Sequence, residues 1–237
     1  MKPQLKMTLA RGLAGAMALL GLAACSSDNN NTTPILQPPQ EFRYDVTVTN
    51  LTHGQPLSPV AVLLHDEGSL WTFGEAASNE LEVLAEGGDN ADVLGLSFVD
   101  MGASGTGPIP PGGSETVILT LTGTVYTYLT LATMLVNTND AFAGVSRVQV
   151  SQLGVGDSMS LRAPVYDAGT EQNSELAGTI PGPADGGEGY NATRNDVNFV
   201  ARHPGVVSAD DGLTLSVLSD AHRFDNPLVN VEITRVQ

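Results

Sequence analysis

The sequence predicts an all-β protein, an antiparallel sandwich or barrel with one short helix and long loops. Three observations support this prediction. Many short stretches combine β-branched or alternating apolar residues, 26 glycines and 14 prolines punctuate the chain, and only one stretch has a convincing helical period. Short strands with frequent Gly and Pro turns are typical of sandwiches and barrels, because each turn redirects the chain into a neighbouring strand.

The first strand is expected over residues 42–49, where Phe42, Tyr44, Val46 and Val48 alternate with polar residues. This period of two places the apolar side chains on one face and indicates a half-buried antiparallel strand. The last strand, 228–236, alternates in the same way. Further strands are expected over 60–65, 93–99, 116–122, 126–136, 145–150, 158–162, 197–202 and 213–218.

A single helix is expected over residues 78–86. Ser78 can cap its N-terminus, Leu81 and Leu84 share one face, and Gly87 can end it. Residues 101–113 are rich in glycine and proline and are expected to form a loop. Residues 164–194 carry no convincing strand, and so long a loop in a compact domain is usually functional or disordered.

The N-terminal part of the chain predicts an exported lipoprotein. Residues 1–24 have the basic start and short apolar run of a signal peptide, and the run is too short to cross a bilayer as a mature helix. Residues 22–25, LAAC, match the bacterial lipobox, which predicts acylation of Cys25, the only cysteine. Residues 25–41 are expected to form a flexible tether and 42–237 one domain. These features predict attachment to a membrane through Cys25 in the bacterial cell envelope. Ser26 after the cysteine favours the outer membrane.

The charge distribution excludes several classes of partner. The formal net charge is −16, and both lysines lie in the signal peptide, which leaves seven scattered arginines against 26 acidic residues. Nucleic acids and heparin are bound through many Lys and Arg contacts, so neither is expected as a partner. An acidic surface is compatible with binding of divalent cations.

Two acidic loops provide candidate metal ligands. Asp140 and Asp167 are the leading candidates, with Glu171 and Asn139 next; Glu175 and Asp196 are possible supplements. Carboxylates on separate loops suit Ca²⁺, which takes oxygen ligands from several parts of a chain. The alternative is that these residues are solvated turn residues, because Asn and Asp also favour turns. The four histidines lack zinc-site spacing, and His65 and His222 are expected on the surface.

Three segments resemble the spondin N-terminal domain family. They are NDAFAGV at 139–145, YDAGTE at 166–171 and TIP at 179–181, of which the second is the most specific. The resemblance covers residues 42–237. It implies a C2-like β-sandwich with a Ca²⁺ ion held by loops at one end, and Asp140 and Asp167 match the acidic positions of the family. Glu171 stands where animal members have aspartate. The chain lacks the lysines, disulfide cysteines and thrombospondin repeats of those members, so their matrix and heparin binding is not expected here.

The predicted function is that of a non-enzymatic, lipid-anchored domain with a calcium site in its loops. It is expected to serve in adhesion, in binding an extracellular protein or glycan, or in a structural role. One alternative is a hydrolase acting on envelope polysaccharide, with two loop carboxylates as acid and base. Another is a structural lipoprotein without a ligand.

Overall fold

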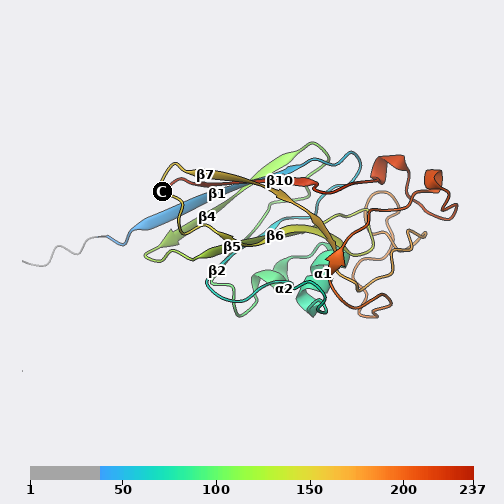
Figure 1. Ribbon diagram of the computed structural model, residues 1–237, viewed down its shortest axis with the longest axis horizontal. Coiled ribbons are helices and arrows are strands. Elements are labelled where there is room, and N and C mark those ends of the chain that lie inside the picture. The colour runs from blue at the N-terminus through green and yellow to red at the C-terminus, as the bar shows by residue number, and fades with distance from the viewer. Residues whose placement is uncertain (1–37) are drawn as a thin grey trace, which may run out of the picture. The chain divides into compact units, whose positions relative to one another are not determined.

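Two antiparallel sheets packed face to face form the computed structural model, which describes residues 38–237 (Figure 1). The four-stranded sheet has the order β4 (Ser114–Thr122), β1 (Glu41–Asn50), β10 (Val229–Arg235), β7 (Ser158–Ala163). The six-stranded sheet has the order β3 (Met101–Ser104), β2 (Ala61–His65), β5 (Tyr128–Met134), β6 (Ala141–Gln149), β8 (Val165–Asp167), β9 (Ala201–Arg202). The expected all-β sandwich is therefore confirmed.

The alternating pattern of the first strand explains its central place. In β1, Tyr44, Val46 and Val48 are fully buried, while the residues between them are partly exposed. Val46 lies opposite Ile233 of β10 and Val117 of β4, so all three strands direct apolar side chains into the space between the sheets. The first and last strands of the domain are thus hydrogen-bonded neighbours.

The predicted helix is present as α1 (Asn79–Gly87). Ser78 caps it by accepting a hydrogen bond from the Leu81 N–H over 3.3 Å. The helix ends one residue later than expected, because Gly88 takes the left-handed conformation, with φ of 71°, and closes its last turn. A second, unexpected helix, α2 (Ala91–Leu94), follows directly, and both helices cover the outer face of the six-stranded sheet (Figure 1).

Three strand predictions were wrong or largely wrong. The region 93–99 begins in α2 instead of a strand, and β3 lies inside the expected loop 101–113. The region 213–218 contributes only an isolated bridge from Ser216 to Leu176, and of 197–202 only Ala201–Arg202 forms a strand. Leu218 instead packs with residues of other loops in a small separate core: Ile180 and Val206.

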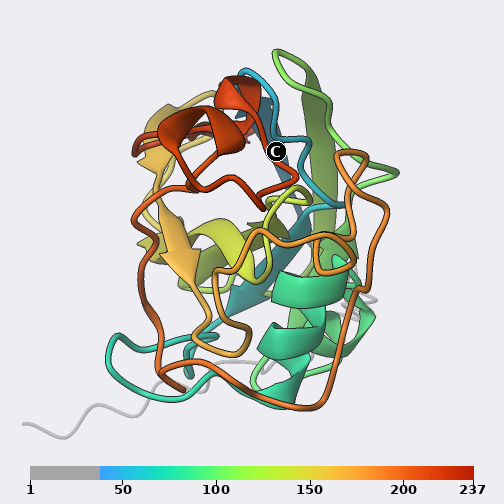
Figure 2. The ribbon, with the colours of Figure 1, turned by 90° about the vertical axis from the view of Figure 1, so that its right-hand side faces the viewer.

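Long loops cover one end of the sandwich. Residues 168–200 and 203–228, which include the 3₁₀ turns η1 (Ala209–Asp211) and η2 (Asp220–His222), lie across this end beside α1 (Figure 2). They belong to the compact unit Pro39–Gln237. The predicted signal peptide 1–24, Cys25 and nearly all of the tether 25–41 lie outside the described residues. Among the described helices, none has the length and apolar character needed to cross a membrane.

Candidate metal site

The sheet brings Asp140 and Asp167 to the same place. Asp140 immediately precedes β6, and Asp167 is the last residue of β8. The two strands are antiparallel neighbours in which Ala141 lies opposite Asp167. The start of one strand and the end of the other therefore meet at one edge, beneath the loops that cover this end of the sandwich.

The turn that leads into β6 is buried. Asn137, Thr138, Asn139 and Asp140 are each at most 2% exposed. The Thr138 hydroxyl donates to the Leu135 carbonyl over 2.6 Å and accepts from the Ala141 N–H over 3.1 Å, and these two bonds close the turn. The alternative of a solvated turn is therefore wrong for Asn139 and Asp140.

The two carboxylate oxygens of Asp140 have different environments. Oδ2 accepts hydrogen bonds from the Thr170 N–H (2.7 Å), the Thr170 hydroxyl (3.2 Å) and the Glu171 N–H (3.1 Å). Oδ1 is buried and has no hydrogen-bond partner among the described residues. A buried carboxylate oxygen without a partner is costly unless a proton or a cation compensates it.

Asp167 is held by its own loop and by a chain of polar side chains. Its Oδ1 accepts from the Gly169 N–H over 2.7 Å, and its Oδ2 accepts from the Asn173 amide over 2.6 Å. The Asn173 amide oxygen contacts Nε2 of His203 at 3.0 Å, while Nδ1 of His203 accepts from the Gly205 N–H. The histidine must therefore carry its proton on Nε2 and donate to Asn173.

The glycine of the YDAGTE segment is required by this geometry. Gly169 has φ of +70°, and a Cβ atom there would lie 2.4 Å from the Phe199 carbonyl oxygen. Only glycine fits both the conformation and the close approach. The Asn198 N–H donates to the Gly169 carbonyl over 2.7 Å, so this contact joins the start and the end of the loop 168–200.

Burial makes ionisation of the Asp140 and Asp167 carboxylates unfavourable. It raises the pKa of Asp140 to about 7, and the charge of Asp167 adds to this shift. Burial likewise raises the pKa of Asp167, although its hydrogen bonds from Asn173 and Gly169 oppose the change. Both carboxylates therefore resist ionisation, and a divalent cation would stabilise their charged forms.

Asn139 and Glu171 lie next to this pair and contact each other. The Asn139 amide nitrogen is 3.0 Å from Glu171 Oε1 and also 3.0 Å from the Thr179 hydroxyl. Its amide oxygen accepts a long bond of 3.4 Å from the Glu175 N–H. Burial raises the pKa of Glu171 to about 7, with contributions from the charges of Glu86 and Glu188. Metal binding by Asn139 and Glu171 stays a prediction.

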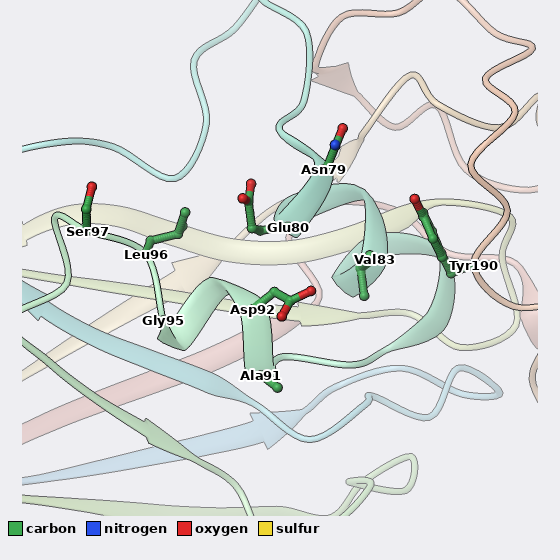
Figure 3. A pocket seen from close by; sticks show the side chains of 9 residues that line it. All are labelled: Asn79, Glu80, Val83, Ala91, Asp92, Gly95, Leu96, Ser97 and Tyr190. Carbon is green, nitrogen blue, oxygen red and sulfur yellow. The ribbon is translucent and has the colours of Figure 1, made fainter.

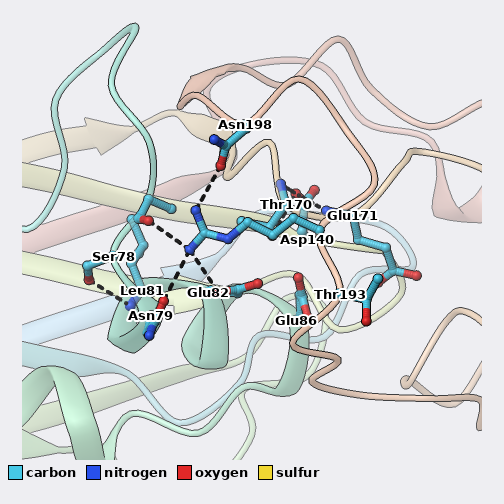
Figure 4. Close-up of polar contacts among 12 residues, drawn as sticks. Ser78, Asn79, Leu81, Glu82, Glu86, Asp140, Thr170, Glu171, Thr193 and Asn198 are labelled. Carbon is cyan, nitrogen blue, oxygen red and sulfur yellow. Dashed lines mark hydrogen bonds and ion pairs between the residues drawn. The ribbon is translucent and has the colours of Figure 1, made fainter.

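Two glutamates of α1 extend the acidic region, and they were not foreseen. Glu82 and Glu86 are at most 2% exposed, and Arg194 makes an ion pair with Glu82 at 2.7 Å (Figure 4). Glu86 accepts from the Asn191 N–H over 2.9 Å. The sequence contained a signal for them, because residues four apart lie on one face of a helix and the helix contains no basic residue.

All buried side-chain oxygens without a hydrogen-bond partner in residues 38–237 belong to this region. They are Oδ1 of Asp140 and one Oε1 each of Glu82 and Glu86. Native proteins pair the great majority of buried polar atoms, so exceptions call for an explanation. Here every exception is a carboxylate oxygen, which accepts a proton or a cation but cannot donate.

The remaining sequence candidates have other surroundings. Asp196 lies close enough to Asp167 for its pKa to be raised by burial and by the charge of Asp167. Glu175 is buried and accepts from the Val207 N–H over 3.1 Å, which fixes a neighbouring loop. The surface prediction for His65 was wrong, because this residue is fully buried between Thr130 and the Glu67 carbonyl.

The carboxylates do not form a dense metal cluster. Within the described part of the chain, no three His, Cys, Asp or Glu side chains are arranged to hold a metal ion. A cation at Asp140 and Asp167 would therefore need further oxygens from amides, hydroxyls or backbone carbonyls. Calcium accepts such ligands readily, whereas zinc prefers His and Cys.

No known relative supports the site. Comparison with models of protein families and with characterised proteins finds no match. The resemblance to the spondin N-terminal domain family therefore stays a prediction based on three short segments.

A separate cavity of about 710 Å³ lies on the other side of α1 (Figure 3). Glu80, Val83, Asp92 and Tyr190 are among its lining residues. None of the four predicted metal ligands lines it. Helix α1 thus directs Glu80 towards this open cavity and Glu82 and Glu86 towards the buried acidic region.

Proposed function

We propose that the protein is a non-enzymatic, lipid-anchored domain of the bacterial cell envelope, with a calcium site at Asp140 and Asp167. The observation that supports this proposal best is the buried, unpaired Oδ1 of Asp140, beside a second carboxylate whose charge raises the pKa of Asp140. A divalent cation would satisfy this oxygen and remove the repulsion between the two charges.

The residues present fit a hard cation. Asp140 and Asp167 would provide carboxylate oxygens, with Glu171 and Asn139 as the further predicted ligands. Bound calcium would supply positive charge at the point where β6, β8 and the loop 168–200 meet. Because Thr170 and Glu171 already donate their N–H groups to Asp140, a cation that keeps this carboxylate ionised would preserve these charge-assisted hydrogen bonds between the loop and the sheet.

The burial of the carboxylates favours a binding role over a polysaccharide hydrolase. A glycosidase needs two carboxyl groups that reach the bond to be cleaved. Asp140 is fully buried and Asp167 is 6% exposed, so a sugar chain has no direct access to this pair. The ordered loops, rather than the carboxylates, would then contact an extracellular protein or glycan, in adhesion or in a structural role.

Thermal unfolding in excess Ca²⁺ and in EGTA tests this proposal. Calcium at ~100 times its Kd should stabilise the fold by ~2.7 kcal/mol and raise the Tm by ~5–11 °C for a domain of this size. Asp140→Asn and Asp167→Asn should each abolish the response. Identical unfolding curves in Ca²⁺ and EGTA would rule out the calcium site.

Asp92→Asn is the matched control for these variants. It makes the same change of charge at an exposed position of α2, which lies outside the acidic region. The control should retain the full calcium response. A loss of the response in Asp92→Asn as well would show that calcium acts through the general negative charge of the surface.

A further inference from the structure

Two arginines line one cavity where the edges of the two sheets meet. Arg162 is on β7, the edge strand of the four-stranded sheet, and Arg202 is on β9, the edge strand of the six-stranded sheet. Pro164 connects β7 to β8 between them. The cavity has a volume of about 460 Å³ and is lined by Arg162, Pro164, Arg202, Asn226 and Pro227.

These two arginines differ from the other arginines of the described chain. Neither side chain forms an ion pair within residues 38–237, and the guanidinium of Arg162 has no hydrogen-bond or cation–π partner there. Arg202 contacts only aromatic faces, with its guanidinium 4.9 Å from the ring centre of Tyr166 and 5.7 Å from that of Phe73. Each of the other arginines donates to a carboxylate or to a backbone carbonyl: Arg43, Arg147, Arg194, Arg223 and Arg235.

The excess of acidic residues in the chain makes two arginines without an ion pair in the described residues unusual. Acidic residues outnumber arginines and lysines by 26 to 10 in the whole chain, so an acidic partner is readily available to most cations. Arg162 and Arg202 are both exposed, so solvent screens part of their mutual repulsion, but an anion in the cavity would still be attracted by both charges. The cavity is therefore a local positive site on an acidic protein.

The walls of the cavity are fixed by hydrogen bonds. Asn226 Oδ1 accepts from the Val165 N–H over 2.6 Å, and the Leu228 N–H donates to the Ala163 carbonyl over 3.2 Å. The aromatic contacts hold Arg202 over Tyr166. Pro164 and Pro227 add rigid apolar surface between the arginines. A preformed cavity with few polar groups and an apolar lining is typical of small-molecule sites.

We infer that this cavity binds a phosphate monoester that carries an apolar or planar group. The guanidinium fork matches phosphate oxygens, and two arginines from different strands can share the several acceptors of one phosphate group. The prolines would contact the organic part of the ester. The site is separate from the predicted calcium ligands and does not depend on the proposed calcium binding.

Titration of the ¹⁵N-labelled protein with phenyl phosphate and with inorganic phosphate, in EGTA at fixed ionic strength, tests this inference. Phenyl phosphate should shift the amide signals of Val165, Arg202 and Asn226 and bind more tightly than inorganic phosphate. Arg162→Gln and Arg202→Gln should each weaken binding about tenfold or more, because each removes a charged hydrogen-bond donor. Arg43→Gln, which alters a partly buried pair with Asp45 on β1, should leave binding unchanged.

A second arm distinguishes a free ester from a lipid headgroup. Neutral vesicles with and without phosphatidic acid are sedimented with the protein and with the same variants. Sedimentation that requires phosphatidic acid and is lost in Arg162→Gln assigns the site to a lipid headgroup, whereas binding of phenyl phosphate alone assigns it to a soluble ester. Absence of binding in both arms, or binding that neither arginine variant changes, would overturn the inference.

Discussion

Glu86 accepts a hydrogen bond of 2.9 Å from the backbone N–H of Asn191, and this bond attaches the middle of the loop 168–200 to helix α1. A second attachment lies close by, where Arg194 pairs with Glu82 and donates to the Ala77 carbonyl. The same loop begins with the residues that donate to Asp140. Helix, loop and candidate ion site therefore form one connected polar region, and a change in one part should alter the others.

Removal of Arg194 should destabilise the fold strongly. Arg194→Met leaves the carboxylate of Glu82, whose side chain is 3% exposed, without its charge partner. Loss of one member of a buried pair typically costs ~3–5 kcal/mol. Urea unfolding should show this loss, and the double variant Arg194→Met with Glu82→Gln should recover most of it. If the double variant is as unstable as Arg194→Met, the loss of stability comes from the lost packing of the arginine and not from the unpaired charge of Glu82.

Asp140→Asn should stabilise the protein when calcium is absent. The amide oxygen can still accept from Thr170 and Glu171, and the amide nitrogen can replace Oδ1 and donate towards Asp167. Removing an unpaired buried charge should contribute ~1–3 kcal/mol at pH 8 in EGTA, as measured by urea unfolding. The same variant should lose the calcium response. A large destabilisation in EGTA would contradict the assignment of Oδ1 as an unsatisfied atom.

The stability of the calcium-free protein should decrease as the pH rises towards neutrality, because two buried acids, Asp140 and Glu171, outweigh the opposite contribution of His203. Burial moves the pKa of Asp140 from 3.8 to about 7, so between these values the unfolded chain has released a proton that the folded chain retains. The folded state binds more protons in this window, and each such group lowers the free energy of unfolding by at most ~1.4 kcal/mol per pH unit. Glu171 acts in the same direction. Urea unfolding in EGTA across this range should show the decrease, and Asp140→Asn should make it shallower.

The contribution of His203 to the stability of the folded protein should fall as the pH drops below 6.5. Burial lowers its pKa from 6.5 to about 4, so between these values the unfolded chain binds a proton that the folded chain excludes. Stability from this residue is present above pH 6.5 and is lost as the pH falls towards 4. His203→Gln removes the titrating group and can still donate to Asn173. Comparison of its urea unfolding with that of the parent at pH 5 and pH 8 isolates this contribution.

Phe142→Ala should be among the most damaging core substitutions. Phe142 is fully buried between the six-stranded sheet and α1, with ring centres 5.1 Å from Trp71 and 5.2 Å from Tyr166. Truncation of a buried phenylalanine costs ~3–5 kcal/mol. Leu215→Ala, at a position 73% exposed, serves as a control and should change the urea midpoint little. Equal effects of the two substitutions would contradict the assignment of Phe142 to the core between the six-stranded sheet and α1.

The sequence predicted the sheets better than the loops. Alternation in residues 42–49 and 228–236 identified β1 and β10 because both strands bury one face only. The apolar residues of 213–218 gave a false strand, since Leu218 joins a loop core that only the tertiary structure defines. Asp140 and Asp167 lie at adjacent strand ends, and their role as metal ligands stays a prediction. Glu82 and Glu86 were missed because their burial depends on the distant Asn191 and Arg194.

The pairing of β1 with β10 constrains how the protein folds. Residues 44–50 of the first strand find their partners at 229–235, close to the C-terminal end of the sequence. The central pairing of the four-stranded sheet therefore cannot form until residues 229–235 have left the ribosome. Such non-local contacts slow folding, because a large loop must close before they form. In every shorter nascent chain the sheet order β4-β1-β10-β7 is incomplete, and the apolar faces of β1 and β4 lack the strand that completes their core.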